Sequence, residues 1–371
     1  MRDVLLVAGE TSGDLHASGV AAALARRAPE RALVGIGGDR MAAAGVTLLE
    51  HTDRLAVMGF AEVLAHIPRH YQLLRALRRR LASGRVGLVI LVDYPGFNLK
   101  VAAAARAAGV PVLYYITPQV WAWGAGRLAT MARTVTRAAV ILPFEEELLR
   151  RHGIAATFVG HPLLDRAAHD FPDRAAARKE LGLPEDAPVL ALFPGSRAQE
   201  IARHLDRFVA TARMLEQRVP GLRPVVSVAP GITLDPARCP YPLVHSASFT
   251  VWRAADAALS KSGTSTLEAA VAGCPLIVAY RTGALSYAIA KRVVTIPHIG
   301  LVNVVAGRRV APEFIQDSVE PAAMADALVP LLDHGSAERR TMLEGLAQVR
   351  ARLGEPGAAE RVAAIALEMV Q

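Results

Sequence analysis

The stretch Ser260-Lys261-Ser262-Gly263-Thr264-Ser265-Thr266-Leu267-Glu268 has the pattern of a strand end, a turn of small residues and a helix start. An apolar run over residues 257–259 leads into it. Gly263 allows the backbone to approach a ligand closely, and free N–H groups at a helix start suit a phosphate. Glu268 follows about one turn later, where its carboxylate could accept hydrogen bonds from ribose hydroxyls. The stretch therefore offers hydrogen-bond donors for a diphosphate and a hydrogen-bond acceptor for a sugar, as a nucleotide requires.

The same pattern also fits an ordinary capped helix, because Ser/Thr-x-x-Glu is a capping box and Thr264 and Ser265 can both cap. Taken alone, this second interpretation would be preferred. A second loop of the phosphate-binding kind, Phe193-Pro194-Gly195-Ser196-Arg197, follows an earlier strand in the same half of the chain. Arg197 can make charge-assisted hydrogen bonds to phosphate oxygens. The two loops together favour a nucleotide diphosphate site.

Length and composition limit the class of protein. A chain of 371 residues favours two domains of ordinary size. No apolar window is long enough to span a membrane and Met1-Arg2-Asp3 leads directly into a strand, so we expect neither a transmembrane helix nor a signal peptide. Two cysteines cannot form a disulfide framework and match no metal-site spacing, which favours a reducing, cytoplasmic setting. The net charge of +8 fits a basic soluble protein, or an anionic partner such as a nucleotide, a phosphorylated lipid or an acidic membrane surface.

Each half of the chain alternates strands and helices, and the charged segment 165–188 is the expected boundary between the halves. Strands are expected over residues 4–8, 33–36, 86–92, 112–116, 140–142, 189–193, 225–228, 243–244, 257–259 and 275–279, and an apolar loop over 55–60. Helices are expected over residues 15–26, 61–81 with a kink or division at Pro68, 248–254, 312–316, 324–332, 339–352 and 358–370. The alternation predicts an α/β fold of two Rossmann-like, doubly wound domains that face a central cleft, with ligands at the facing strand ends.

Three carboxylates follow predicted strands in the first half. Glu10 and Asp14 come after the strand over residues 4–8, where doubly wound sheets place ligand groups, although Asp14 could equally cap the next helix. Asp93 ends the strongly apolar strand over 86–92, where stability poorly explains a carboxylate. Burial would raise its pKa, which suits a general base, whereas capping a helix or bracing a loop is the structural alternative. We favour the base.

Two further segments allow a structural and a functional interpretation. The loop Thr117-Pro118-Gln119-Val120-Trp121-Ala122-Trp123-Gly124 holds two of the three tryptophans, which could pack in the core or line a pocket for an acyl chain or a sugar. The arginine-rich helical stripe over residues 61–81 could be a solvated helix face or a contact with a membrane surface.

Short motifs run in order along nearly the whole chain: Ala8-Gly9-Glu10-Thr11-Ser12-Gly13-Asp14, Ala56-Val57-Met58-Gly59, Asp93-x-Pro95-x-Phe97-Asn98, Pro118-Gln119-Val120-Trp121-Ala122-Trp123, Leu142-Pro143-Phe144-Glu145, Val159-Gly160-His161-Pro162, Pro194-Gly195-Ser196-Arg197, Ser262-Gly263-Thr264-x-x-Leu267-Glu268 and Asn303-x-x-Ala306-Gly307-Arg308. Each motif alone is weakly diagnostic. In this order they closely resemble the lipid-A-disaccharide synthases, glycosyltransferases of the two-Rossmann-domain (GT-B) architecture.

The resemblance implies a reaction. UDP-2,3-diacylglucosamine would donate its sugar to 2,3-diacylglucosamine 1-phosphate (lipid X), giving the β-1,6-linked lipid A disaccharide 1-phosphate and UDP. The anomeric centre inverts, so one base suffices, and Asp93 matches the family's essential aspartate. UDP would be bound by Gly195, Ser196, Arg197, Ser262, Gly263, Thr264, Ser265 and Glu268. The acceptor and sugar would be bound by Glu10, Ser12, Gly13, Asp14, Gln119, Trp121 and Asn303. Neither a metal nor a cofactor is expected.

The chain departs from the family pattern in several places. Gly96 stands where many members have Asp, so that position is not expected to be indispensable. Gly124 stands where an arginine often follows the second tryptophan, so any phosphate role there would pass to Arg127 or be lost. Val302 replaces a proline, which would loosen the loop without removing Asn303.

The resemblance also implies a place in the cell and a domain organisation. The protein would be cytoplasmic and peripheral on the inner face of the inner membrane, where its basic surface, most of all residues 61–81, would contact anionic lipid. The expected domains are an acceptor-binding domain of residues 1–165, on which a C-terminal helix of about 350–371 packs back, and a UDP-sugar-binding domain of residues 166–349. Since the family includes homodimers, a homodimer is one assembly that it allows.

Other classes of protein are alternatives. Another UDP-sugar enzyme of this fold, a peptidoglycan N-acetylglucosaminyltransferase or a UDP-GlcNAc 2-epimerase, is the runner-up. A basic nucleic-acid-binding protein is disfavoured, because the arginines are scattered and lack aromatic partners, so no nucleic-acid partner is expected. A nucleotide-binding regulator without chemistry is disfavoured by Asp93.

Overall fold

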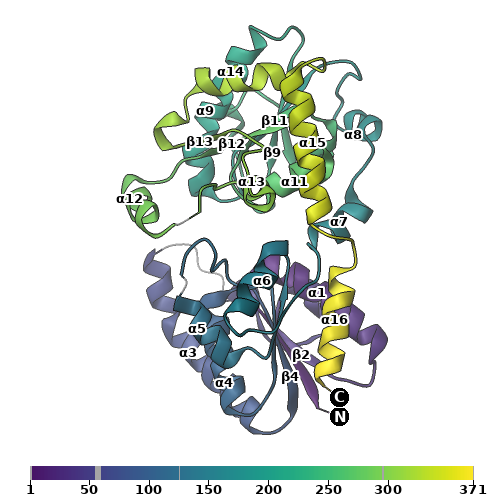
Figure 1. Ribbon diagram of the computed structural model, residues 1–371, viewed down its shortest axis with the longest axis vertical. Coiled ribbons are helices and arrows are strands. Elements are labelled where there is room, and N and C mark those ends of the chain that lie inside the picture. The colour runs from purple at the N-terminus through teal and green to yellow at the C-terminus, as the bar shows by residue number, and fades with distance from the viewer. Residues whose placement is uncertain (1, 55–59, 125, 295, 371) are drawn as a thin grey trace. The chain divides into compact units, whose positions relative to one another are not determined.

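The chain folds into two compact units, a first unit of Met1–Pro162 with Gly354–Gln371 and a second unit of Leu163–Leu353. In the computed structural model, residues 2–54, 60–124, 126–294 and 296–370 are described. Each unit is a parallel sheet flanked by helices (Figure 1). The expected apolar loop over 55–60 and the motif at residues 56–59 lie outside the described residues, apart from Phe60, which begins a helix.

The first unit contains a seven-stranded parallel sheet in the order β3-β2-β1-β4-β5-β6-β7. Its strands are β1 Asp3–Ala8, β2 Leu33–Gly37, β3 Thr47–His51, β4 Val86–Val92, β5 Val112–Tyr115, β6 Arg137–Val140 and β7 Ala156–Phe158. The strand order reverses between β1 and β4, whose last residues, Ala8 and Val92, are paired. Ligands of doubly wound sheets bind at such a reversal, beyond the carboxyl ends of the strands. The loops that begin at Gly9 and Asp93 therefore start side by side at the expected ligand position.

Alternate residues of the strands feed two cores, one on each face of this sheet. In β1, Leu5 and Val7 join one core, whereas Val4, Leu6 and Ala8 join the other. The helices of the unit are α1 Thr11–Arg27, α2 Asp39–Ala43, α3 Phe60–Ala82, α4 Pro95–Ala107, α5 Gly126–Thr134, α6 Pro143–Arg151 and α16 Ala358–Met369, with a 3-10 turn at Thr52–Arg54. The strands are thus buried on both faces, as a parallel sheet requires.

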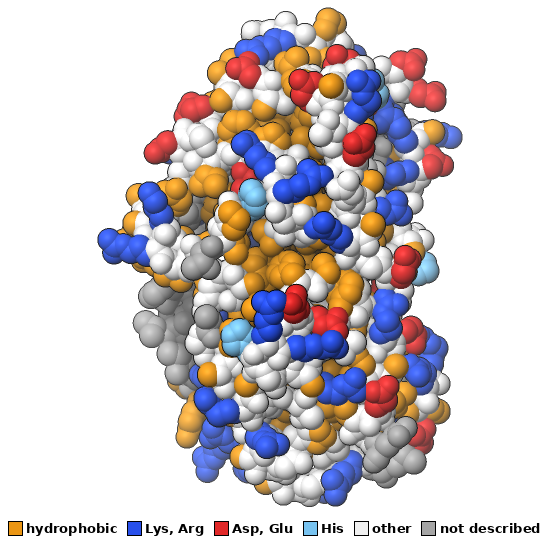
Figure 2. All heavy atoms as spheres, in the orientation of Figure 1, with side chains coloured by type: hydrophobic (Ala, Val, Ile, Leu, Met, Phe, Trp, Pro, Cys, Tyr) orange, Lys and Arg blue, Asp and Glu red, His pale blue; other side chains and the backbone are white. Residues whose placement is uncertain are grey.

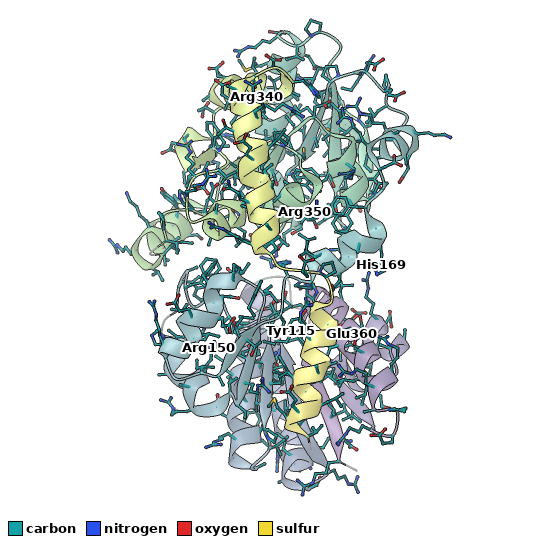
Figure 3. All side chains as sticks on the ribbon, turned by 45° about the vertical axis from the view of Figure 1, so that its right-hand side comes forward. Tyr115, Arg150, His169, Arg340, Arg350 and Glu360 are labelled. Carbon is teal, nitrogen blue, oxygen red and sulfur yellow. The ribbon has the colours of Figure 1, made fainter. Side chains whose placement is uncertain are left out.

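The last helix of the chain, α16, packs on the first unit. Its Val362 and Ile365 belong to the core that α1 covers, and Glu368 pairs with Arg137 at 2.6 Å. Arg361 donates to the carbonyl of Val159 at 2.8 Å. Figure 3 shows Glu360 on this helix, beside the sheet that contains Tyr115. Apolar burial and these polar contacts together hold the end of the chain on a domain built from its beginning.

The second unit contains a six-stranded parallel sheet in the order β10-β9-β8-β11-β12-β13. Its strands are β8 Val189–Phe193, β9 Arg223–Val228, β10 Leu243–His245, β11 Ala257–Lys261, β12 Leu276–Tyr280 and β13 Glu313–Ile315. The order reverses between β8 and β11, and Phe193 is paired with Ser260 near their carboxyl ends. The two phosphate-type loops of the sequence follow these two strands, so they begin next to each other at the reversal.

The helices of the second unit are α7 Leu163–Asp170, α8 Arg174–Glu180, α9 Ala198–Glu216, α10 Ser248–Ala254, α11 Ser265–Ala272, α12 Ala284–Val293, α13 Leu301–Ala306, α14 Pro321–Leu332 and α15 Ala337–Arg352, with 3-10 turns at Pro236–Arg238 and Gln316–Ser318. A buried carboxylate ties α8 to the sheet. Asp256 contacts Arg178 at 2.7 Å and Arg174 at 2.5 Å, and the Val189 N–H donates to it at 2.8 Å.

The structure differs from several local predictions. Residues 312–316 were expected to be helical, but β13 there extends the edge of the sheet by pairing with β12, and so short a strand shows no period of its own. The segment 165–188 holds α7 and α8, which both belong to the second unit. The strand expected over 140–142 is β6, which ends at Val140. A kink or a division was expected at Pro68, and the structure excludes the division, because α3 continues as one helix through this residue.

Candidate active site

The loop after β4 places Asp93 in a strained backbone conformation. Asp93 and Tyr94 have φ angles of 49° and 50°, in the left-handed region that residues other than glycine rarely adopt. Each such residue costs on the order of 1–3 kcal/mol, and strain of this kind clusters at functional sites. The half-buried Asp93 therefore ends the central strand of the first unit in a conformation that the surrounding structure must enforce.

Asn98, at the start of α4, enforces this conformation together with Tyr114. The fully buried Asn98 amide donates to the carbonyl oxygens of Asp93 at 2.7 Å and Val92 at 3.2 Å. The Tyr114 hydroxyl donates to the same Asp93 carbonyl at 3.0 Å. The sequence analysis had left open that the Asp93 side chain braces its loop. These two side chains bind the backbone carbonyl of Asp93 and not its carboxylate, so here the loop is braced through the backbone.

The surroundings of the Asp93 carboxylate favour its protonated form. Burial raises its pKa, the charge of Glu10 raises the pKa further, and the Tyr94 N–H lowers it. Glu10 itself is exposed, after the neighbouring strand β1. Close approach of the two loops requires Gly9, since a Cβ there would lie 2.1 Å from the Tyr94 ring. A carboxyl group whose pKa is raised is a better general base than an ordinary aspartate, provided that it is ionised at working pH.

Asp14 has a structural role that the sequence did not predict. It is 4% exposed and accepts hydrogen bonds from the backbone N–H groups of Gly38 at 2.6 Å, Met41 at 3.1 Å and Arg40 at 3.2 Å. These groups lie at the start of α2, so Asp14 caps a neighbouring helix, whereas its own helix or a ligand had been expected. Ser12 is exposed near the start of α1, and Gly13 is buried.

The tryptophan loop contains one half-buried and one exposed ring system. Trp121 donates to Glu145 at 3.0 Å and meets Phe144 edge-on at 5.3 Å, whereas Trp123 is 46% exposed. Burial raises the pKa of Glu145 to about 7. The Arg127 guanidinium lies 4.3 Å from the Trp123 ring centroid, so this arginine stacks beside the position that Gly124 leaves without one. Gln119 is exposed in the same loop.

In the second unit, the loop after β8 turns on Gly195. Its φ is 140°, and a Cβ there would lie 2.6 Å from the Cβ of Glu200, so the position requires glycine. The Ser196 N–H donates to Glu200 at 3.0 Å. Arg197 is exposed at the start of α9. The loop therefore presents a guanidinium to solvent from a rigid turn.

Lys261 is a residue to which the sequence analysis gave no role. Its ammonium lies 2.8 Å from the second carboxylate oxygen of Glu200. Glu200 thus accepts from an amide of the β8 loop and from a cation at the end of β11, and it joins the two loops. Burial would raise the pKa of Glu200, but the ammonium of Lys261 and the Ser196 N–H hold it below its ordinary value. The sequence signal that could have identified Lys261 was its position at a strand end, within the motif expected to bind phosphate.

The hydroxyls of the 262–266 turn point back to carbonyl groups. Ser262 donates to Ile299 at 2.7 Å, Ser265 to Lys261 at 3.1 Å and Thr266 to Gly263 at 2.9 Å. Thr264 stands at the cap position of α11, but no side-chain hydrogen bond caps that helix. The expected hydroxyl caps are therefore wrong. The amides at the start of α11 are left uncapped by side chains, as an anion site requires.

Glu268 is mostly enclosed, with its side chain 12% exposed. It accepts from the Trp252 indole at 3.0 Å and lies 3.9 Å from Arg166. Trp252 in turn stacks on Phe193 at the end of β8, with ring centroids 3.9 Å apart. Burial raises the pKa of Glu268, against the lowering effect of Arg166. Its carboxylate is thus held in place beside the two loops by aromatic packing.

Asn303 has all its hydrogen bonds satisfied within the second unit. It is fully buried and donates to the Ala311 carbonyl and to Glu313, both at 2.8 Å. Its oxygen accepts from the N–H groups of Val310 at 2.7 Å and Ala311 at 2.9 Å. These bonds use the whole amide to fix the approach to β13, so the predicted contact of Asn303 with the sugar is replaced by a structural role.

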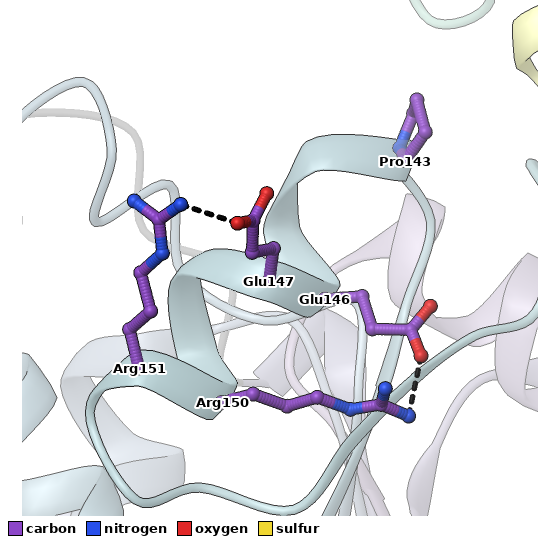
Figure 4. A pocket seen from close by; sticks show the side chains of 5 residues that line it. All are labelled: Pro143, Glu146, Glu147, Arg150 and Arg151. Carbon is purple, nitrogen blue, oxygen red and sulfur yellow. Dashed lines mark hydrogen bonds and ion pairs between the residues drawn. The ribbon is translucent and has the colours of Figure 1, made fainter.

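A shallow depression on α6 is lined by Pro143, Glu146, Glu147, Arg150 and Arg151. Two ion pairs of one helical turn, Glu146–Arg150 and Glu147–Arg151, already satisfy its charges (Figure 4). Among the described residues, no group of three His, Cys, Asp or Glu side chains is arranged to hold a metal ion. No helix of the described part is both long and apolar enough to cross a membrane.

The two doubly wound units, each with its candidate residues at the strand reversal, define a protein of the GT-B fold. A solved glycosyltransferase of kitacinnamycin has a similar fold, with a TM-score of 0.67 and 16% identity over 100% of this chain and 99% of that one. A putative UDP-N-acetylglucosamine 2-epimerase from Listeria monocytogenes reaches a TM-score of 0.64 at 13% identity, over 97% of this chain and 94% of that one. At such low identity the likeness extends to the fold alone.

Comparison with related sequences identifies the family within this class. The profile of the lipid-A-disaccharide synthetase family matches residues 4–366. A lipid-A-disaccharide synthase from Myxococcus xanthus (strain DK1622) is 43% identical over 375 aligned positions, which cover 99% of this chain and 97% of that protein. The chain belongs to the lipid-A-disaccharide synthase family.

Proposed function

We propose that this chain is an inverting glycosyltransferase that moves 2,3-diacylglucosamine from UDP-2,3-diacylglucosamine to 2,3-diacylglucosamine 1-phosphate. The products are the β-1,6-linked disaccharide 1-phosphate and UDP. Membership of the family supports the substrate class. The observation that carries the chemistry is Asp93, a carboxylate of raised pKa held in a strained loop at the strand reversal of the first unit.

Asp93 is the proposed base. Its ionised carboxylate takes the proton of the acceptor's 6-hydroxyl as the oxygen attacks the anomeric carbon of the donor. The bond from that carbon to the diphosphate breaks in the same step, and UDP leaves with the electron pair. One displacement converts an α-linked donor into a β-linked product, so no covalent sugar intermediate is needed.

The leaving diphosphate is the proposed ligand of the second unit. Arg197 and the amides at the start of α11, over residues 263–265, supply positive charge where negative charge develops. Lys261 at the end of β11 adds a second cation to the same pair of loops. Gly195, Ser196 and Ser262 shape the loops, and Glu268 is the proposed acceptor for the ribose hydroxyls.

For the acceptor and sugar we retain the residues of the first unit whose side chains are exposed or half-buried. Glu10, Ser12 and Gln119 are exposed, Trp121 is half-buried, and Gly13 contributes backbone. For Asp14 and Asn303 we propose structural roles and no contact with the sugar, because Asp14 caps α2 and Asn303 binds the segment before β13. We further propose that the protein works at the cytoplasmic face of an anionic membrane, and that a homodimer is one form it adopts.

The direct test is incubation of the purified protein with UDP-diacylglucosamine and lipid X, with the products followed by mass spectrometry. We expect a tetraacyl disaccharide 1-phosphate and one equivalent of UDP. Parallel incubation with UDP-GlcNAc alone tests for the epimerase of similar fold. Conversion of UDP-GlcNAc together with no disaccharide would overturn the proposal.

A further inference from the structure

Helix α12 of the second unit, Ala284–Val293, exposes apolar side chains along one face. Leu285 is 76% exposed, Ile289 56% and Val293 47%. They are spaced four residues apart, so they lie in one stripe on the helix surface. No residue of α12 is buried. A soluble helix ordinarily turns such a stripe toward its own core, so this stripe is left for an outside partner.

The helix is attached at its beginning. The Thr282 N–H donates to the Gln316 side chain at 2.7 Å, and Gln316 donates back to the Thr282 carbonyl at 3.1 Å. Gly283, the residue before the helix, has an extended backbone. These contacts fix where α12 starts while leaving its apolar stripe free.

The charged side chains in the segment that contains α12 are all basic. Residues 281–298 contain Arg281, Lys291 and Arg292 and no Asp or Glu. Lys291 and Arg292 are exposed on the last turn, and Figure 2 shows basic and hydrophobic side chains together over α12, at the left of that view. A stripe of aliphatic side chains with adjoining cations matches an anionic lipid surface, which offers acyl chains beneath negative headgroups. A protein partner would need only the stripe.

The described C-terminal part of α3 differs from α12. There Leu74, Leu77 and Leu81 are buried in the core, and Arg75 and its neighbours are exposed on the other side. That half of α3 has its leucine face covered, and among residues 68–82 only Tyr71, 64% exposed, is a large apolar side chain at the surface. Apolar and basic side chains face outward together on α12.

We infer that α12 docks the protein on an anionic lipid bilayer, with Leu285, Ile289 and Val293 inserted at the interface and Lys291 and Arg292 at the headgroups. The inference rests on the proposed function, because both proposed substrates are membrane lipids. It deepens that function by naming the surface that contacts the membrane. It assigns to the second unit a surface that the sequence analysis had sought at residues 61–81.

The test is flotation of the full-length protein with vesicles of phosphatidylethanolamine and phosphatidylglycerol. Exchanging Leu285, Ile289 and Val293 together for Gln keeps the helix propensity and should weaken binding by about tenfold or more. Exchanging Lys291 and Arg292 for Gln should weaken it by about fivefold per charge, and only at low salt. Wild-type protein should bind phosphatidylcholine vesicles more weakly.

The matched control exchanges Arg340 and Arg350 for Gln. Both are exposed on α15 of the same unit (Figure 3), so the change removes the same charge elsewhere, and vesicle binding should stay near wild type. Thermal unfolding checks that every variant is folded. Unchanged flotation of the Gln triple variant, or a change in its self-association without a change in flotation, would overturn the inference. Flotation needs no substrate, so a failed glycosyl-transfer assay would contradict the proposed function and leave this result standing.

Discussion

At the scale of single residues, the candidate site depends on side chains that hold others. Asp93 is aimed by Asn98 and Tyr114, which grip its carbonyl rather than its carboxylate. Glu200 joins the two loops of the second unit by accepting from Ser196 and Lys261. In both units, neighbouring side chains make the contacts that hold the loop. The residues proposed for chemistry are Asp93 in the first unit and Arg197 in the second.

Asp93→Asn is expected to lower kcat by about 10²–10⁴-fold, because the amide cannot take the acceptor's proton. UDP affinity, measured by calorimetry, should change little, since the proposed diphosphate ligands belong to the other unit. Arg197→Ala should weaken UDP binding and also slow turnover. Turnover by Asp93→Asn at more than a tenth of the wild-type rate would contradict the role of base.

The pH profile of kcat/KM tests the same residue. Burial and Glu10 raise the pKa of Asp93, and the base works only when ionised. Activity should therefore fall with decreasing pH, on a limb whose midpoint lies above the ordinary aspartate value of about 3.9. Glu10→Gln removes one of the raising charges and should shift the limb to lower pH. A limb that stays in place in this variant would show that Asp93 is not the titrating group.

Lys261→Met is expected to weaken UDP binding by about tenfold, the loss of roughly one charge-assisted contact. Lys179→Met, at an exposed lysine on α8, is the control and should bind UDP like the wild type. The measurement is a titration with UDP. Equal affinities of the two variants would remove Lys261 from the diphosphate site.

At the scale of elements, the strand order determines which loops can cooperate. β1 lies beside β4, and β8 beside β11, so segments far apart in sequence end at the same point of each sheet. The opposite end of the second sheet is secured separately. There the Asp256 side chain, 1% exposed, pairs with Arg174 and Arg178 of α8, and Arg339 of α15 donates to the Asp256 carbonyl at 2.6 Å.

Asp256→Asn should lower the free energy of unfolding by about 3–5 kcal/mol, because it leaves buried guanidinium charge without a partner. Burial alone would raise the pKa of Asp256, but hydrogen bonds from Arg174 and Val189 hold it below its ordinary value. A lowered pKa means that this stabilisation is present above about pH 4 and is lost as the pH falls through the native-state pKa.

Asp206→Asn is the surface control for that measurement. Asp206 pairs with Arg238 at 2.9 Å, with side chains 70% and 47% exposed. Such pairs contribute about 0–1 kcal/mol, so denaturant unfolding should barely change. Similar losses in the two variants would contradict the central place of Asp256 in the second unit.

At the scale of the whole molecule, the last helix of the chain belongs to the same unit as the first residues. The last residues leave the second unit after Leu353, and α16 completes a core of the first unit with Val362 and Ile365. The first unit is therefore incomplete until the last residues of the chain are present. Hydrogen exchange can test this, because the effect of damage to α16 should follow the units rather than the sequence.

Val362→Asp, which buries an unpaired charge at a fully buried position, should destabilise the first unit by several kcal/mol. Amide exchange should rise in β1 and α1 and stay unchanged in β8 and α9. Glu360→Gln removes only an exposed ion pair with Arg26 of α1, which contributes about 0–1 kcal/mol, so exchange in both units should change little. Equal acceleration in the two units would show that α16 does not belong to the first unit alone.

The sequence alone determined the alternation of strands and helices, most strand positions, and the loops that carry Asp93, Arg197 and Gly263. These features are local, since apolar runs, glycines and strand ends show in a window of a few residues. Family motifs extended this to a reaction, which the comparisons support at the level of the family.

Only the tertiary structure decided what long-range contacts determine. It showed Asp14 capping a helix that begins 25 residues later in the chain, at Asp39, and Asn303 consumed by the approach to β13. It joined Lys261 to Glu200 and left the stripe of α12 uncovered. A polar side chain has the same letter in the sequence whether it meets a ligand or a distant backbone amide, and only folding brings one or the other within a hydrogen bond's reach.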